Sequence, residues 1–158
     1  MKFWFDTEFH EEPGRLELIS IGIVSEDGRE FYAENVEYDV TRASNWLWKN
    51  VIPHLTGSAT TRKNIAERID LFVGLHPEFW AYNAPYDWVL LCQLYGSLMN
   101  TPGSWSSYVN DVLWLRDQVD PRGKVQVPPP KTPHHALEDA RWCRNLYNAY
   151  MAHMGVHL

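Results

Sequence analysis

The segment at positions 2–9, KFWFDTEF, constrains the fold more than any other part of the sequence. Aromatic and acidic residues alternate in it, as is typical of a β-strand with one buried face. Residues two apart on a strand share a face, so Asp6 and Glu8 point one way while Phe5 and Phe9 point the other. Adjacent carboxylates raise each other's pKa, and a bound cation would neutralise them. A solvent-exposed strand face with two hydrated acids is the alternative.

Two further strands are expected directly after this one. Residues 16–24 (LELISIGIV) are apolar and β-branched, which indicates a buried strand. The pair Asp27-Gly28 favours a tight turn, and residues 29–34 (REFYAE) return from it. The chain is therefore predicted to open with three antiparallel strands.

The rest of the chain combines helical patterns with one more strand. Apolar residues at helical spacing and residues that can cap an N-terminus indicate five helices. We expect them from Thr41 to Lys49, from Thr60 or Thr61 to Val73, and over residues 85–98, 111–119 and about 132–154. Residues 78–82 are predicted to form a short strand, 99–110 a loop, and 120–133, with five prolines, an extended connector. This order predicts an α/β fold in which helices flank a mixed sheet.

Length and composition limit the class of protein. A chain of 158 residues is expected to form one domain over residues 1–158, and its 45% apolar content is too high for disorder. No run approaches the ~18 uncharged apolar residues of a membrane span, and the first residues lack a signal-peptide pattern. Two cysteines, Cys92 and Cys143, favour a reduced, cytoplasmic protein. The net charge of −6 argues against a basic face that grips a long duplex.

Two other segments carry acids in unusual settings. In NAPYD at 83–87, Asp87 falls in the first turn of an apolar helix, where the helix N-terminus alone also favours an acid. In HHALED at 134–139, two histidines precede an acid at a helix start, where a capping or surface role also suits them. Together with the first strand, these segments supply carboxylate oxygens, which are hard ligands, from three separate elements. Such ligands suit Mg²⁺ or Mn²⁺, and a pair of these ions can cleave a phosphodiester.

The combination of Asp-x-Glu, Asn-x-x-Tyr-Asp and His-x-Ala-Leu-x-Asp-Ala resembles the DEDDh family of 3′–5′ exonucleases in the ribonuclease H-like superfamily. The order and spacing match from Asp6 to Asp139. FDTEF, ELISIGIVSEDGREFYA, LCQLYG and HHALEDAR are most similar to the polyadenylate-specific 3′-exoribonuclease AS group. The resemblance implies a ribonuclease H-like mixed sheet, three antiparallel strands plus parallel ones, flanked by helices.

The resemblance also implies roles for the matching residues. Asp6 would bridge two Mg²⁺ ions, for which Mn²⁺ can substitute. Glu8 and Asp139 would hold the ion that activates water, and Asp87 would hold the other. His134 would be the general base, because a neutral imidazole near pH 7 suits proton transfer from the attacking water.

The two neighbouring histidines leave one ambiguity. In a regular helix, residues four apart share a face, so His135 rather than His134 would lie beside Asp139. The family motif instead matches His134, which then has to lie on the segment leading into the helix after Pro133. We follow the motif and take His134 as the base.

The implied substrate is the 3′ end of single-stranded RNA, adenylate-rich in the closer resemblance, released as nucleoside 5′-monophosphates. Phe9 is expected to wedge against the terminal base, with Thr7 and Asn83 as further substrate contacts. Two bound Mg²⁺ ions would add +4 to the net charge of −6, leaving about −2 and a pocket attractive to phosphate. A single-stranded DNA exonuclease and an inactive nucleic-acid-binding module are the alternatives. The closer resemblance also implies a homodimer.

Overall fold

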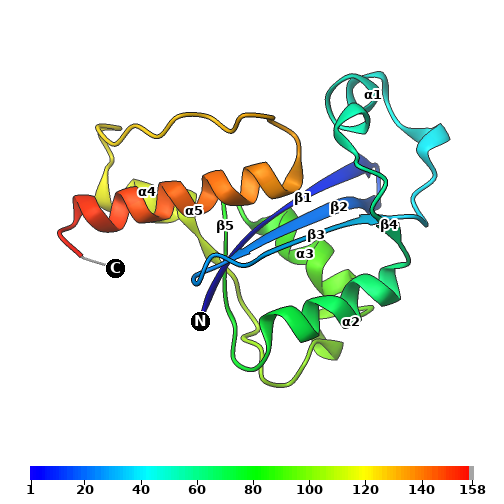
Figure 1. Cartoon of the computed structure of the whole chain (residues 1–158), viewed down its shortest axis with the longest axis horizontal. Coiled ribbons are helices and arrows are strands. Elements are labelled where there is room, and N and C mark those ends of the chain that lie inside the picture. The colour runs from blue at the N-terminus through cyan, green and yellow to red at the C-terminus, as the bar shows by residue number, and fades with distance from the viewer. Residues whose placement is uncertain (157–158) are drawn as a thin grey trace.

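The fold is built on a six-stranded mixed sheet with helices on both faces (Figure 1). The computed structural model describes residues 1–156. The strands lie in the order β4-β3-β2-β1-β5-β6; β1 to β3 are antiparallel, and the short β4, β5 and β6 run parallel to their neighbours. Their bounds are β1 Lys2–Glu12, β2 Arg15–Ser25, β3 Glu30–Asn35, β4 Ala59–Thr60, β5 Glu78–Ala81 and β6 Asn110–Asp111. The expected antiparallel opening and mixed sheet are confirmed.

Five α-helices surround the sheet. They are α1 Asn45–Asn50, α2 Arg62–Val73, α3 Pro85–Gln93, α4 Val112–Val119 and α5 Ala136–His153, with short 3₁₀ turns at Val40–Arg42, Ile52–His54 and Leu98–Asn100. In Figure 1, α2 and α3 cover one face of the sheet, and α5 lies across the other. None of these helices, nor any other in residues 1–156, has the length and hydropathy needed to cross a membrane.

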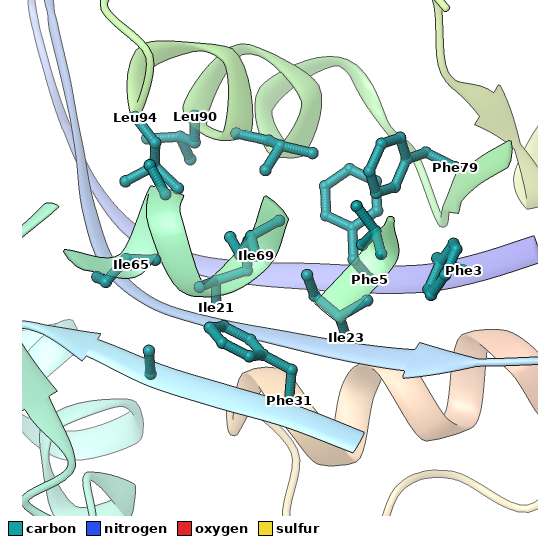
Figure 2. Packing of buried hydrophobic residues seen from close by; sticks show 14 of the residues in the cluster. Phe3, Phe5, Ile21, Ile23, Phe31, Ile65, Ile69, Phe79, Leu90 and Leu94 are labelled. Carbon is teal, nitrogen blue, oxygen red and sulfur yellow. The ribbon is translucent and has the colours of Figure 1, made fainter. Parts of the chain in front are cut away.

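The main core lies between the sheet and the helices α2 and α3. Phe3 and Phe5 of β1 are fully buried there together with Ile21 of β2, and Figure 2 shows them facing Ile69 and Leu90. Each fully buried side chain of this kind stabilises the fold by about 1.5–3 kcal/mol. Because side chains alternate along a strand, burial of Phe3 and Phe5 turns Asp6 and Glu8 toward the opposite face.

The opposite face is covered by α5, which comes unusually close to the sheet at Gly22. Gly22 pairs with Asp6 on one side and with Tyr32 on the other. A Cβ atom at position 22 would lie 2.4 Å from the Cα and the backbone nitrogen of Leu137. The first turn of α5 therefore rests directly on the β2 backbone, beside Asp6.

A β-bulge positions α1 at the end of the same face. The register of β1 and β2 shifts between Glu8 and Phe9, which leaves Ile19 as an extra residue on β2. Ile19 packs with Leu47 and Val51 in a small separate cluster. The bulge thus turns the apolar side chain of Ile19 toward α1, and this contact holds α1 beside the start of α5.

Several expected element bounds are wrong, and each has a local cause. The last helix begins at Ala136 rather than near 132, because His135 is its N-cap, in an extended conformation, and residues 131–134 form bends and a turn instead of a helix. The third helix ends at Gln93 rather than 98, where the chain turns through Gly96 with φ 89°. Thr41 lies in a 3₁₀ turn capped by Asp39, and Ser44 caps the helix that follows.

Two elements were absent from the sequence prediction. β4 and β6 have only two residues each, which is too short for an alternating pattern to show. β6 nevertheless matters for the site, since its last residue, Asp111, also caps α4.

We predict that Gly22→Ala weakens the fold and displaces α5. The added methyl group meets backbone atoms, which cannot rotate away, so we expect a loss of about 1–3 kcal/mol in unfolding free energy. Gly103→Ala is the matched control, since a Cβ there meets nothing within 4 Å, and its effect should stay within about 0.5 kcal/mol. Equal denaturation midpoints for the two variants would contradict the close approach.

Candidate active site

Three carboxylates meet where α5 crosses β1. Asp6 and Glu8 project from β1, and Asp139 projects from the first turn of α5. One ligand oxygen from each of the three lies within 4.8 Å of those of the other two. Three carboxylate oxygens at this separation form a donor set that suits a hard divalent cation.

Asp87 approaches the same region from α3. Its Oδ1 accepts two hydrogen bonds from Thr7, one from the amide at 2.9 Å and one from the hydroxyl at 2.6 Å. Thr7 lies between Asp6 and Glu8 in sequence, so these bonds fix Asp87 against β1. They use Oδ1 and not Oδ2, which leaves the second oxygen for a ligand.

Asp111 shapes the turn that leads to Asp87, and sequence reasoning missed it. Its two carboxylate oxygens accept hydrogen bonds from the amides of Asn83 and Ala84, at 3.1 and 3.0 Å. The same carboxylate caps α4 through the amide of Leu113. Asn83 has a left-handed φ of 57°, a conformation that these bonds support. A lone aspartate carries no motif, so only the fold identifies this role.

Burial makes the acidic group electrostatically unfavourable without a cation. Desolvation, reinforced by the charges of the neighbouring acids, raises the pKa of Asp6 well above its usual range and that of Glu8 to about 8. Desolvation also raises the pKa of Asp87, to about 6, although the hydrogen bonds from Thr7 oppose it. For Asp139, burial outweighs the hydrogen bond from the His134 amide, and the pKa is again raised. A bound divalent cation would reverse this repulsion.

The two histidines occupy different environments. His134 has a left-handed φ of 64°, its amide donates to Asp139 Oδ2 at 2.8 Å, and its ring meets Trp46 edge-on at 4.9 Å. It lines the same hollow as Asp6, Glu8 and Asp139. His135 does not line that hollow, and its ring stacks on Tyr32 instead.

Two adjoining hollows surround the carboxylates. They have volumes of about 390 and 360 Å³ and share Asp6, Thr7, Phe9 and Tyr82 as a common wall. The first continues past Asn83, Pro85, Tyr86 and Asp87, and the second past Glu8, Trp46, Pro133, His134, Asp139 and Trp142. All the residues assigned to the site from the sequence therefore line at least one of the two hollows. Thr7 lines both, but its amide and hydroxyl are already bonded to Asp87.

Four aromatic side chains in these hollows were not assigned to the site from the sequence. Tyr86 meets Phe9 edge-on at 5.5 Å, and Tyr82 meets Trp142 edge-on at 5.0 Å. Trp46 reaches His134 from α1. The chain has 22 Trp, Tyr and Phe residues, and their periodicity does not separate core residues from site residues.

A second close group of possible ligands has a different explanation. Ligand atoms of His10, Glu12 and Glu17 also lie within 4.8 Å of one another. The guanidinium of Arg42, however, forms ion pairs with both glutamates. That group is an ion-pair network completed by arginine, so the carboxylates around Asp6 remain the candidate centre.

Comparisons with known proteins agree with this geometry. The E. coli exonuclease I–single-stranded DNA complex in its zinc-bound form superposes with a TM-score of 0.71 at 11% identity, over 98% of this chain. Exonuclease I from Methylocaldum szegediense gives a TM-score of 0.65 at 15% identity, over 96% of this chain. The chain spans about two-fifths of the length of those exonucleases, 41% and 40%. The chain thus shares the fold of these exonucleases, a mixed sheet flanked by helices, as the sequence resemblance implied.

Sequence comparison defines the family within this class. The profile of the 3′–5′ exoribonuclease Rv2179c-like domain matches residues 1–151. The 3′–5′ exoribonuclease Rv2179c of Mycobacterium tuberculosis H37Rv is 38% identical over 150 residues, which cover 89% of this chain and 88% of the relative. The chain belongs to the Rv2179c-like 3′–5′ exoribonuclease domain family.

We predict that the metal-free protein becomes less stable as pH rises from about 5 to 8. The folded chain binds the Glu8 proton up to a pKa of about 8, whereas an ordinary glutamate releases it near 4.5. Protonated Glu8 therefore makes its full contribution to the free energy of unfolding below about pH 4.5. This contribution is lost as pH rises through 8, at up to about 1.4 kcal/mol per pH unit for one proton.

Thermal denaturation in EDTA at several pH values measures this slope. Mg²⁺ should raise the midpoint most at the highest pH, because protons compete with the cation for the carboxylates. Glu8→Gln should flatten the metal-free slope. A midpoint that rises with pH in EDTA would contradict the assigned burial of these acids.

Proposed function

We propose that this protein is a metal-dependent 3′–5′ exoribonuclease that hydrolyses single-stranded RNA to nucleoside 5′-monophosphates. One observation carries the proposal: three carboxylates, that of Glu8 buried and those of Asp6 and Asp139 partly buried, converge within 4.8 Å beside His134, in a hollow on the fold of known exonucleases. Such a group is unfavourable unless a cation binds, and family membership supplies the direction of hydrolysis. Residues 1–158 are taken as a single exonuclease domain.

The four acids are assigned as ligands of two Mg²⁺ ions, with Mn²⁺ as a substitute. Asp6, Glu8 and Asp139 would hold one ion, while Asp6 and the second oxygen of Asp87 would hold the other. When bound, these ions supply positive charge that polarises the scissile phosphate and lowers the pKa of a water molecule. Thr7 keeps Asp87 oriented for this role through its two hydrogen bonds.

His134 is assigned as the general base. Its ring borders the hollow that contains Glu8 and Asp139, and a neutral imidazole can accept a proton from water near pH 7. Asp139 holds the His134 amide, and Trp46 packs against the ring, so both the backbone and the side chain of the base are supported.

Substrate contacts follow from the two hollows. Phe9 lies in the wall that they share, where an aromatic ring can stack against the terminal base and separate it from the next one. Asn83 and Thr7 line the hollow beside Tyr86 and are proposed to contact the terminal nucleotide. The scissile phosphate would then lie at the junction, next to Asp6.

RNA is preferred over DNA in this proposal because the 38%-identical relative is named an exoribonuclease. Adenylate-rich 3′ ends are proposed from the closer family resemblance. A single-stranded DNA exonuclease is the second candidate, favoured by structural similarity to an exonuclease I bound to single-stranded DNA. An inactive binding module is less favoured, since the four acids and His134 all line the hollows.

Two further properties belong to the proposal. We place the protein in the cytoplasm, because Cys92 and Cys143 are buried as free thiols. We also propose a homodimer, in which exposed aromatic residues of α1 such as Trp46 and Trp48 form part of the contact. Light scattering of the purified protein measures the oligomeric state.

We predict that Asp6→Asn abolishes hydrolysis and stabilises the metal-free fold. The neutral amide keeps the shape of the side chain but removes a buried, repelled charge, so the denaturation midpoint in EDTA at pH 8 should rise. Activity should fall by about 10³-fold or more, since several kcal/mol of transition-state stabilisation depend on the ions. Activity on 5′-labelled single-stranded RNA near the wild-type level would refute the two-ion assignment.

We predict that 5′-labelled RNA is shortened one nucleotide at a time in Mg²⁺ or Mn²⁺ and stays intact in EDTA. Homopolymers of A, C, G and U and matched DNA oligonucleotides separate the two candidate functions. Faster turnover of RNA, and of poly(A) among the homopolymers, is the expected result. Turnover of DNA alone would establish the second candidate, and metal-independent binding without cleavage would establish the inactive module.

A further inference from the structure

His135 occupies a built environment that the proposed mechanism does not use. Its ring lies parallel to that of Tyr32, with centroids 4.7 Å apart and planes at 17°. This is the only parallel pair among the aromatic contacts of residues 1–156; the others are tilted or edge-on. Tyr32 lies on β3 opposite Gly22, in the row that ends at Asp6. The stack therefore lies beside the point where α5 touches the sheet.

Tyr32 is itself held in place. Its hydroxyl donates to Glu34 Oε1 at 3.0 Å, and Glu34 is buried. Glu34 also accepts hydrogen bonds from the amides of Thr56 and Gly57, at 2.5 and 3.1 Å, and from the Thr56 hydroxyl at 3.0 Å. The Tyr32 ring is thus a fixed surface for the His135 ring.

The backbone of His135 connects this surface to the catalytic groups. As the N-cap of α5, its carbonyl accepts the first helical hydrogen bond, from the amide of Asp139 at 3.0 Å. The carboxylate of Asp139 reaches back to the amide of His134 at 2.8 Å. Residues 134 and 139 are therefore linked through the residue whose ring stacks on Tyr32. A shift of His135 would move a proposed metal ligand and the proposed base together.

One nitrogen of the His135 ring is shut off from proton transfer. Nδ1 is buried and has no hydrogen-bond partner within residues 1–156. A ring nitrogen with neither partner nor solvent cannot pass a proton onward. Its side chain forms no capping bond to α5 either. The contact that the ring does make is its flat face, which lies against Tyr32.

We propose that His135 is a positioning residue, which acts through its stack on Tyr32 to hold His134 and Asp139 in place. The proposal rests on the proposed hydrolytic function and deepens it. It also assigns different roles to the neighbouring histidines: His134 transfers the proton, and His135 sets the geometry. His134 needs such support because a left-handed conformation is unfavourable for a residue with a side chain.

Substitution at position 135 separates a positioning role from a chemical one. His135→Ala removes the stack, so kcat on RNA should fall roughly 10- to 100-fold, as expected when catalytic groups are displaced by about 1 Å. KM should change by less than about threefold, because the stack lies outside both substrate hollows.

His135→Phe keeps a flat ring and removes an unpartnered nitrogen, so it should restore kcat to within about threefold of wild type, with an unchanged acid limb of the pH profile. His134→Phe is the matched control and should be inactive, because phenylalanine cannot act as the proposed general base.

Tyr32→Leu tests the same proposal without altering either histidine, and so remains informative if His135→Ala fails to fold. It should reproduce the loss of kcat, and the double variant Tyr32→Leu/His135→Ala should lose no more than the larger single loss. Additive losses, or full activity in either single variant, would overturn the proposal. An inactive but folded His135→Phe would overturn it in favour of proton transfer by His135. If the wild-type protein cleaves no RNA or DNA, it is the proposed function that fails.

Discussion

The contact between α5 and the backbone of β2 at Gly22 is the constraint on which the site depends. Asp139 lies on the first turn of α5, whereas Asp6 and Glu8 lie on β1. With any side chain at position 22, the helix would have to lift away from the sheet, since a Cβ there would overlap the backbone of Leu137. The absence of one side chain thus lets the carboxylates of two distant segments meet within 4.8 Å.

A second constraint is electrostatic, and the alternation of β1 explains how the fold tolerates it. Phe3 and Phe5 are fully buried on one side of the strand and contribute to the main core. Asp6 and Glu8 fall on the other side, where burial and mutual repulsion raise their pKa values. Stabilisation from the core holds together a group of charges that would otherwise separate. Stability and cation binding are therefore linked at one strand. The fold brings the carboxylates together, and their repulsion lowers the stability of the metal-free protein.

The parts of this molecule that sequence predicts are those with a repeating or local signal. Strand periodicity places Asp6 and Glu8 on one face, and the motif around Asp87 begins a helix as expected. The role of Asp111 was not predicted because its hydrogen bonds with the amides of Asn83 and Ala84 span 28 and 27 residues of sequence. Trp46 escaped for a related reason: its position beside His134 depends on the bulge at Ile19, which no pattern in either segment reveals.

The conflict between motif and periodicity at the two histidines has a physical resolution. His135 would share a face with Asp139 only if a regular helix ran through both histidines, since residues four apart then lie on one side. The helix begins at Ala136, so the 3.6-residue period does not extend to His134 or His135. His134 instead adopts φ 64°, and the hydrogen bond from its amide to Asp139 keeps it on the side of the acids. Helical periodicity is therefore a poor guide at a helix N-terminus, where capping and a single left-handed residue decide which way each side chain points.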